Sequence, residues 1–499
     1  MRSLHCASLF VAVVAASSGC VDRGPQAVAP VGGSATSWRY DVEVDDGARR
    51  LLVDAWLPPG SLADLVVRHG AERFVQAVEV QDDDGWRTVS RRGEAFHVPE
   101  CARGCHLRYR FALRRAADAL RDIDVAIAWG EVVVASPSSW LLHPTLAPDG
   151  TRYRFHVRAA RDASFVTGVF TAPDGPPGSY EADATDIAVA PYAAFGPMRL
   201  RSVEAVPGST LDVAIAGDYR VDDDAIVAWM AKSSRTIARF LGCFPVERVM
   251  VLVVPAAGDA VRHGETMGDG GAAMVLELGE DAGPAALEDD WVLPHEMAHL
   301  AVPSVAPRHH WIEEGLAVYL QPIARARAGE LTPEQVWREF AMGMPKGAPS
   351  HADRGLDDAT DWARTYWGGA TFCLVADVAI RTRTGNRFGL EDAMRGVLAA
   401  GGSVAHIWGL ERLLDTADGS VGAGPLLARM HAEMLRGTWT VDLPGLFRDL
   451  GVHLEGTRVT FDDAAPLAAL RRSITRPLLV GEPEPVACRA TPGGTVAQR

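Results

Sequence analysis

The sequence has little basic charge for its length. Its 499 residues include 49 Lys and Arg against 64 Asp and Glu, which gives a net charge of -15 at pH 7. Proteins that bind nucleic acids carry clustered Lys and Arg, and the sequence contains no such cluster and no internal repeat. The composition therefore excludes nucleic acid as the expected partner. The length predicts two or three folded units rather than one.

The apolar run near the N-terminus is too short to span a bilayer, which takes about 20 residues. It covers Leu9–Ala16, follows the charged Arg2 and precedes Ser17-Ser18-Gly19-Cys20. This order of segments is typical of an export signal. The Gly-Cys ending resembles a bacterial lipoprotein signal, which implies residues 1–20 as signal and a membrane anchor through lipidated Cys20. The alternative is an ordinary signal peptide that contains a cysteine. Both signals predict export, and the lipoprotein signal predicts a place at the bacterial cell envelope.

Cysteine is also scarce, with seven in the chain, two of them in the N-terminal signal. Cys101 and Cys105 are close enough in sequence to close a small disulfide loop in an oxidising compartment. As a metal site this pair would lack two ligands. Cys243 and Cys373 stand among apolar neighbours and are predicted to be small core residues.

Hydropathy patterns divide the rest of the chain into successive regions. Residues 21–37 are rich in Gly, Pro, Ala and Ser, which is typical of a linker. Short alternating runs between Gly, Pro and Asp clusters predict an antiparallel β domain over residues 38–205. Strands alternate with long helices over residues 206–328, and helices dominate residues 329–466. Residues 467–499 are predicted to be a tail without regular structure.

One predicted helix contains His295-Glu296-Met297-Ala298-His299. Histidines four apart lie on the same face of a helix, so both imidazoles can reach one metal ion, and Glu296 lies close enough to act on a water there. Apolar neighbours such as Leu293 and Leu300 predict that this helix is buried, and buried histidines need partners. The alternative is a surface helix with two solvated histidines.

A second segment follows as Trp311-Ile312-Glu313-Glu314-Gly315-Leu316-Ala317-Val318-Tyr319. Glu-Gly-Leu-Ala-x-Tyr after an aromatic residue resembles the third-ligand helix of the gluzincin metallopeptidases, where the glutamate before glycine binds zinc. The resemblance implies one Zn²⁺ held by His295, His299 and Glu314, with Glu313 as the alternative third ligand.

A third segment, Thr365-Tyr366-Trp367-Gly368-Gly369-Ala370, precedes Leu374 to Arg381. It resembles the Tyr-x-x-Gly helix of the glycyl aminopeptidase family, whose tyrosine faces the zinc. The resemblance implies that Tyr366 donates its hydroxyl to the oxyanion that forms on a carbonyl; the alternative is a core aromatic. It also implies a multidomain fold: an N-terminal antiparallel β domain, a thermolysin-like α/β zinc-peptidase domain and an α-helical C-terminal domain. The PDZ module that often follows in that family is not evident.

Aminopeptidases of this family and of the aminopeptidase-N type hold the substrate's α-amine with the glutamate of a Gly-Gly-x-Glu or Gly-x-Met-Glu loop. The corresponding stretch here runs from Gly268 to Leu276, and an alanine, Ala273, stands where the glutamate is expected. Asp269 and Glu277 are alternative carboxylates, but strand alternation favours neither. The stretch that contains Gly270, Gly271, Ala272 and Ala273 is still expected to line the cleft and bind a peptide through its backbone.

These patterns predict an exported zinc metallopeptidase that acts on peptides or proteins. Glu296 is the expected general base and Tyr366 the expected oxyanion donor. Aminopeptidase and endopeptidase specificity both stay open because of Ala273. A catalytically inactive, zinc-containing envelope protein with a binding or assembly role is the alternative. The substrate, the cleavage position and the oligomeric state do not follow from the sequence.

Overall fold

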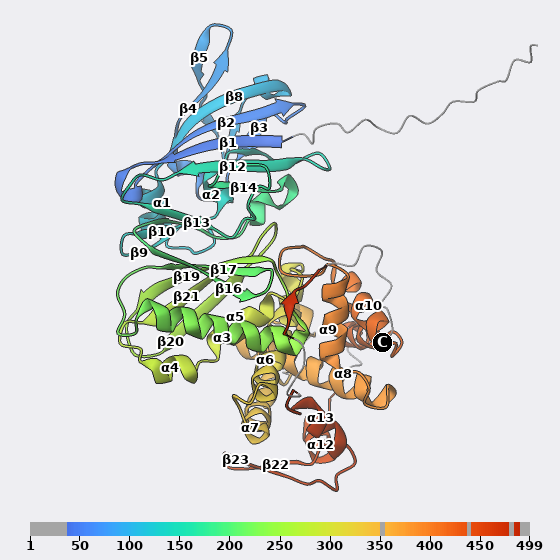
Figure 1. Ribbon diagram of the computed structural model, residues 1–499. Helices are drawn as coiled ribbons and strands as arrows, with labels where there is room; N and C mark the ends of the chain where they lie inside the picture. The colour runs from blue at the N-terminus through green and yellow to red at the C-terminus, as the bar shows by residue number, and fades with distance from the viewer. Residues whose placement is uncertain (1–36, 350–354, 437–440, 479–483, 490–499) are drawn as a thin grey trace, which may run out of the picture. The chain divides into compact units, whose positions relative to one another are not determined.

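The computed structural model describes residues 37–349, 355–436, 441–478 and 484–489, all within one compact unit (Figure 1). The expected signal at residues 1–20, with Cys20, and most of the expected linker lie outside the described residues. Among the described helices, none combines the length and apolarity needed to cross a membrane.

The N-terminal part of the described chain consists mainly of three β-sheets. Their strand orders are β14-β12-β1-β2-β8-β4-β5, β13-β15-β10-β9 and β11-β3-β7-β6. The strands are β1 (Ser37–Val44), β2 (Leu51–Pro59), β3 (Asp64–Val66), β4 (Val75–Asp82), β5 (Gly85–Thr88), β6 (Arg91–Arg92), β7 (Ala95–His97), β8 (Arg103–Phe111), β9 (Ile127–Trp129), β10 (Val132–Val134), β11 (His143–Pro144), β12 (Arg152–Arg158), β13 (Ser164–Thr167), β14 (Ser179–Asp183) and β15 (Ala193–Gly196), with helices α1 (Leu113–Leu120) and α2 (Pro137–Trp140) between them.

The alternating pattern of β1 explains its place in the largest sheet. Every second side chain from Trp38 to Val44 is buried, as a half-buried strand requires. β1 pairs with β2 in the antiparallel sense but with β12 in parallel, from Ser37 opposite Arg152 onward. The prediction of a purely antiparallel domain is therefore wrong for this pair. An alternating pattern reports which face is buried and contains no information on strand direction.

A second mixed sheet, of order β16-β17-β19-β21-β20, begins the remainder of the chain. Its strands are β16 (Arg199–Val206), β17 (Ser209–Ile215), β19 (Arg248–Ala256), β20 (Val261–Met267) and β21 (Ala273–Gly279). β17, β19 and β21 run parallel, whereas β20 is an antiparallel edge strand. The apolar run of β19 is buried on both faces, as expected for an inner parallel strand.

Helices form most of the chain after this sheet and pack on one of its faces. They are α3 (Asp223–Leu241), which lies between β17 and β19 in sequence, and α4 (Pro284–Glu288), α5 (Val292–His299), α6 (His310–Arg327), α7 (Pro333–Gly343), α8 (Gly369–Arg383), α9 (Leu390–Ala399), α10 (Leu410–Val421), α11 (Leu426–Leu435), α12 (Leu443–Asp449) and α13 (Ala468–Ile474), with a hairpin of β22 (Val452–Glu455) and β23 (Arg458–Phe461). One hydrophobic cluster runs from Ala205 to Ile474 and includes side chains of the sheet and of these helices. Sheet and helices therefore share a single core.

A buried network of charged side chains fixes α6, α8 and α9 against one another. Arg381 pairs with Asp377 at 2.8 Å and with Glu391 at 2.7 Å, and Arg327 pairs with Glu391 at 2.7 Å. Tyr319 donates its hydroxyl to Asp377 at 2.7 Å. Because each carboxylate in this network is paired, the burial of its charge is compensated. The network holds together two helices, α6 and α8, that belong to the site described below.

The end of the chain differs from the expected tail. Ala468–Ile474 is helix α13, and β24 (Val486–Ala487) pairs with β18 (Cys243–Phe244). A disulfide joins Cys243 to Cys488, and Cys243 is only half-buried, so the prediction that it is a small core residue is wrong. The two cysteines are 245 positions apart, and pairing over such a distance is a tertiary property. The disulfide predicted between Cys101 and Cys105 is confirmed.

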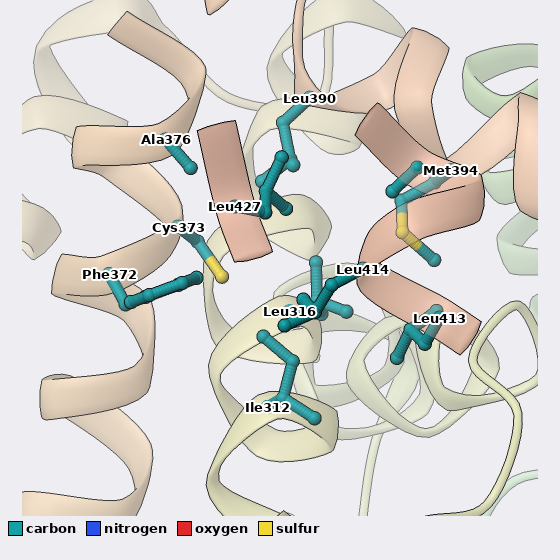
Figure 2. A pocket seen from close by; sticks show the side chains of 11 residues that line it. Ile312, Leu316, Phe372, Cys373, Ala376, Leu390, Met394, Leu413, Leu414 and Leu427 are labelled. Carbon is teal, nitrogen blue, oxygen red and sulfur yellow. The ribbon is translucent and has the colours of Figure 1, made fainter. Parts of the chain in front are cut away.

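Cys373 is buried and unpaired among the described cysteines, as predicted. It lines a small apolar cavity between helices of the C-terminal half (Figure 2). The cavity has a volume of about 10 Å³, and one water molecule requires roughly 10–15 Å³. It is therefore a packing defect of the core and does not form a ligand site.

Candidate metal centre

Helices α5 and α6 bring three side chains to one point. The Nε2 atoms of His295 and His299 lie 3.2 Å apart. The Glu314 Oε2 atom lies 3.3 Å from His295 Nε2 and 3.6 Å from His299 Nε2. The structure thus places together the three residues that the sequence suggests as ligands, with His295 and Glu314 buried and His299 half-buried.

These three atoms fit a tetrahedral zinc site. Zinc bonds of about 2.0–2.1 Å to nitrogen and oxygen place neighbouring ligand atoms roughly 3.3 Å apart. Glu314 Oε2 is also buried without a hydrogen-bond partner. Buried carboxylate oxygens are rarely left unpaired, and a metal ion held by all three atoms accounts for this one.

Charge at the cluster is strongly coupled. Burial opposes ionisation of Glu314, but the charge of His299 and the close contacts with the neighbouring histidines outweigh it and hold the pKa of Glu314 well below its usual range. Burial likewise opposes protonation of His299, but Glu314 outweighs it and raises the pKa of His299 to about 9. The cluster therefore attracts positive charge, which a bound cation would supply.

Local sequence builds the start of α5. Asp290 accepts hydrogen bonds from the backbone N–H groups of Val292 at 2.8 Å and Leu293 at 3.0 Å. These are unpaired donors of the first helical turn, where Pro294, which has no N–H, is tolerated. The turn that precedes His295 is therefore stabilised by the side chain of Asp290.

Two glycines allow Glu314 and the segment of Tyr366 to approach each other. A Cβ atom on Gly315 would lie 2.4 Å from the backbone carbon of Gly369, and one on Gly369 would lie 2.2 Å from the Trp311 carbonyl oxygen. Only glycine at both positions permits this contact between α6 and α8. The glycines of the Glu-Gly and Tyr-x-x-Gly motifs thus have a direct packing role.

Tyr366 lies in a π-helical turn, Arg364–Gly368, that precedes α8. Its ring is parallel to that of His295, with an interplanar angle of 2° and 6.1 Å between ring centroids. Burial and the Glu314 carboxylate raise the pKa of Tyr366 above its usual range, with smaller contributions from Glu296 and Glu265. Tyr366 therefore retains its proton at neutral pH and can act as a hydrogen-bond donor. A π turn that aims a side chain in this way is frequent at functional sites.

The other carboxylate oxygen of Glu314, Oε1, contacts a histidine. His310 Nε2 lies 3.1 Å from Glu314 Oε1, and His310 Nδ1 lies 2.7 Å from Glu313 Oε2. Hydrogen bonds from Glu313 and then Glu314 raise the pKa of His310 to about 10, so it is charged at neutral pH. The other oxygen of Glu313 accepts the Val305 N–H at 2.9 Å. Glu313 is therefore directed away from the histidine pair, and Glu314 toward it.

Glu296 is buried and held by the edge strand β20. The Thr266 hydroxyl donates to Glu296 Oε2 at 2.7 Å. Gly264, two positions earlier, has no side chain, and a Cβ there would lie 2.5 Å from Glu296 Cγ. The strand therefore approaches α5 closely enough to fix the carboxylate beside the histidine pair.

The structure corrects the assignment of the stretch Gly270 to Ala273. Ala272 and Ala273 are fully buried, and Ala273 belongs to β21, which lies between β19 and β20. The N–H groups of Gly270 and Ala272 donate to Ala405 and Gly168 at 3.0 Å each, and Gly271 forms a β-bridge with Val169. This stretch has its backbone groups paired within the protein, so the expectation that it binds a peptide is wrong.

A carboxylate is present on the edge strand β20, that of Glu265. Glu265 precedes Thr266, and its charge acts on both Glu296 and Tyr366. Burial raises the pKa of Glu265, whereas Tyr192 opposes the increase. The sequence does contain a Gly-Glu pair at 264 and 265. It lies upstream of the stretch from Gly268 to Leu276, where the amine-binding glutamate was expected.

A second group of potential ligands consists of His309, Asp357 and His431. His309 Nδ1 and His431 Nε2 lie 2.8 Å and 3.0 Å from the two Asp357 oxygens, and Trp311 donates to Asp357 at 2.7 Å. Arg308 donates to the other nitrogen of His309 at 2.9 Å. These are hydrogen-bond lengths, and the arginine leaves the proton of His309 on Nδ1. This group is a hydrogen-bonded cluster and does not form a second metal centre.

Comparison with solved structures identifies the fold. An aminopeptidase N family protein from Idiomarina loihiensis is 12% identical, with a TM-score of 0.60, over 84% of this chain and 79% of that one. An M1 zinc metallopeptidase from Deinococcus radiodurans is 16% identical, with a TM-score of 0.50, over 82% of this chain and 95% of that one. A mutant of that enzyme bound to a Tyr-Ser-Ala substrate is similar to the same degree, over 82% and 94%.

No family model matches the sequence, and a search of curated proteins finds no match. The chain nevertheless has the fold of the aminopeptidase N and M1 zinc metallopeptidases, and the predicted gluzincin aminopeptidase-like architecture is confirmed at this level. Identities this low establish the fold alone.

Proposed function

We propose that this protein is a zinc-dependent peptidase that removes residues from the free amino terminus of peptides. The observation that supports this most strongly is the meeting of His295, His299 and Glu314 in tetrahedral spacing, with Glu296 and Tyr366 beside them. Glu265 adds a carboxylate on the edge strand next to this group.

Zinc held by the two histidines and Glu314 would supply Lewis acidity, which polarises a carbonyl and makes a water more acidic. Glu296, oriented by the Thr266 hydroxyl, takes a proton from the attacking water and delivers it to the leaving amine. Tyr366 retains its own proton and donates a hydrogen bond to the carbonyl oxygen as negative charge develops there.

The edge strand β20 orients the substrate. β20 has a sheet partner only in β21 among the described strands, so its outer edge can accept an extended peptide through backbone hydrogen bonds. At this edge Glu265 offers a negative charge to the ammonium group of the first residue. A charge-assisted hydrogen bond of this kind fixes which peptide bond faces Glu296.

Replacing Tyr366 with phenylalanine is expected to lower kcat roughly a hundredfold, because removal of one oxyanion donor has this effect in other hydrolases. The variant keeps the ring that is parallel to His295, so its zinc content is expected to equal that of the wild type. The measurement is steady-state hydrolysis of a peptide, with metal content determined on the same samples. Turnover at the wild-type rate would show that the hydroxyl has no catalytic part.

Replacing Glu265 with glutamine is expected to lower kcat/KM for peptides with a free amine by about 10- to 100-fold, since a hydrogen bond to a charged group contributes about 1.5–3 kcal/mol. N-acetylated peptides, which lack the ammonium group, are expected to be poor substrates of both enzymes. The matched control is Glu277→Gln, which removes a carboxylate from the neighbouring strand β21. It is expected to leave kcat/KM unchanged for peptides with a free amine and for N-acetylated peptides. Efficient cleavage of acetylated peptides by the wild type would instead identify an endopeptidase.

We also propose that the protein is exported and anchored at the cell envelope through lipidated Cys20. Support comes from the two disulfides of the described chain, Cys101–Cys105 and Cys243–Cys488. Disulfides of this kind persist in oxidising compartments outside the cytosol. Fractionation of cells that carry a Cys20→Ala variant tests the anchor: the proposal requires the variant to leave the membrane fraction.

A further inference from the structure

Two tryptophans of this protein are exposed to an unusual degree. The sequence contains 13 tryptophans, of which Trp439 lies outside the described residues. Of the described ones, only Trp291 and Trp362 belong to the exposed large apolar residues, with 52% and 58% of their surface accessible. The others are buried or half-buried. An exposed tryptophan leaves a large apolar surface in water, which is costly unless something binds there.

Both exposed tryptophans contact rings of the candidate metal centre. Trp362 stacks on Tyr366, with 5.0 Å between ring centroids and an interplanar angle of 28°. Trp291 meets His295 edge to face, with 5.8 Å between centroids and an angle of 80°. His295 and Tyr366 are in turn parallel to each other. Four rings therefore form a continuous series whose two outer members are the exposed tryptophans.

These contacts do not explain the exposure of the indoles. Each tryptophan already uses one side of its ring against the site, and more than half of its surface remains free. A purely structural role would be served by burying the ring, as the protein does with Trp311 and Trp337. The free surfaces lie next to the two side chains that, under the proposed function, bind zinc and address the carbonyl oxygen.

We propose that Trp362 and Trp291 form an apolar rim that selects substrates with a large apolar, above all aromatic, side chain beside the cleaved bond. Trp362 is placed to contact the residue whose carbonyl is attacked, because it packs on the tyrosine that donates to that carbonyl. Offset or edge-to-face contact with an aromatic ring adds to the burial of the apolar surface. The inference rests on the proposed peptidase function and defines its substrate class.

The test compares two tripeptides, Phe-Ala-Ala and Ala-Ala-Ala, as substrates of the wild type and of the double variant Trp291→Ala/Trp362→Ala. The wild type is expected to prefer the phenylalanine peptide, and the preference, as a ratio of kcat/KM values, is expected to fall about tenfold or more in the double variant. The value for Ala-Ala-Ala is expected to fall less than the value for Phe-Ala-Ala, because that peptide has no ring for the rim to bind. The double variant Trp291→Phe/Trp362→Phe, which keeps an aromatic ring at both positions, is expected to retain most of the preference.

Leu146→Ala, which removes an exposed apolar side chain that is 72% accessible and belongs to the N-terminal part, serves as the control and is expected to have no effect. An unchanged preference in the double variant overturns the inference, and so does an equal loss for both peptides, which would mean that the indoles only support Tyr366. Failure of the wild type to hydrolyse either peptide or longer peptides is a different result and contradicts the proposed function. Binding of free phenylalanine against alanine, measured by calorimetry, reports on the rim without turnover.

Discussion

Replacing Glu296 with glutamine is expected to lower kcat by about 10²- to 10⁴-fold, the usual contribution of a positioned general base. Glutamine has nearly the same shape and can still accept the hydrogen bond that Thr266 donates at 2.7 Å. It cannot take a proton from water. The loss is therefore expected in kcat, with zinc content and thermal unfolding close to those of the wild type. The rate of hydrolysis of a peptide mixture checks the loss in kcat, and metal analysis of the same samples checks the zinc content.

The same variant separates the proposed enzyme from a zinc-containing binding protein. If cells that produce only the Glu296→Gln form behave as the wild type does, hydrolysis is not what the protein contributes, and a binding or assembly role at the envelope is favoured. If both turnover and cellular function are lost while zinc is kept, the peptidase is supported. Loss of zinc from this variant would contradict the position assigned to Glu296, since the structure places it beside the ligands rather than among them.

Glu314→Gln is expected to abolish the stabilisation that zinc confers on the folded protein. A ligand that binds only the native state stabilises it by about 4 kcal/mol when its free concentration is a thousand times Kd. In the wild type, therefore, a chelator is expected to lower the melting temperature and added zinc to restore it. The glutamine variant lacks the charged oxygen that lies 3.3 Å and 3.6 Å from the two histidine nitrogens. Its melting temperature is therefore expected to stay the same when a chelator or zinc is added.

The adjacent carboxylate provides a matched control. Glu313 forms hydrogen bonds with the Val305 N–H and with His310, and it does not face the histidine pair. Glu313→Gln is therefore expected to keep the response of the melting temperature to zinc. Loss of the response in Glu313→Gln but not in Glu314→Gln would reverse the assignment of the third ligand. Thermal unfolding with and without chelator gives the result directly.

Much of the secondary structure is a local property of the chain and follows from the sequence. The run from Val249 to Ala256 is apolar throughout and lies in an inner strand, and α3 begins after Asp222 because that side chain accepts the N–H of Ala225. His295 and His299 share a helical face because of their spacing alone. Patterns over a few residues suffice for each of these features.

Other features depend on segments far apart in the chain. The family resemblance suggested an amine-binding glutamate near position 273. In the structure, the turn after β20 places Ala273 inside the sheet, whereas Glu265 lies on its edge strand. Cys243 was expected to be a small core residue, but it is joined to Cys488, which comes from a region expected to lack regular structure. Each error arises where pairing between distant segments decides the position of a side chain.

By itself the sequence determined the acidic character of the protein, the histidine pair on one helical face, Glu296 next to it, and a glutamate–glycine motif for a third ligand. Only the tertiary structure decided that Glu314 rather than Glu313 turns toward the histidines, that β20 holds Glu296, and that two exposed tryptophans lie against the site. The reason is physical: helical spacing is set by local backbone geometry, whereas these relations require close contacts between helices and strands, such as that of Gly315 with Gly369.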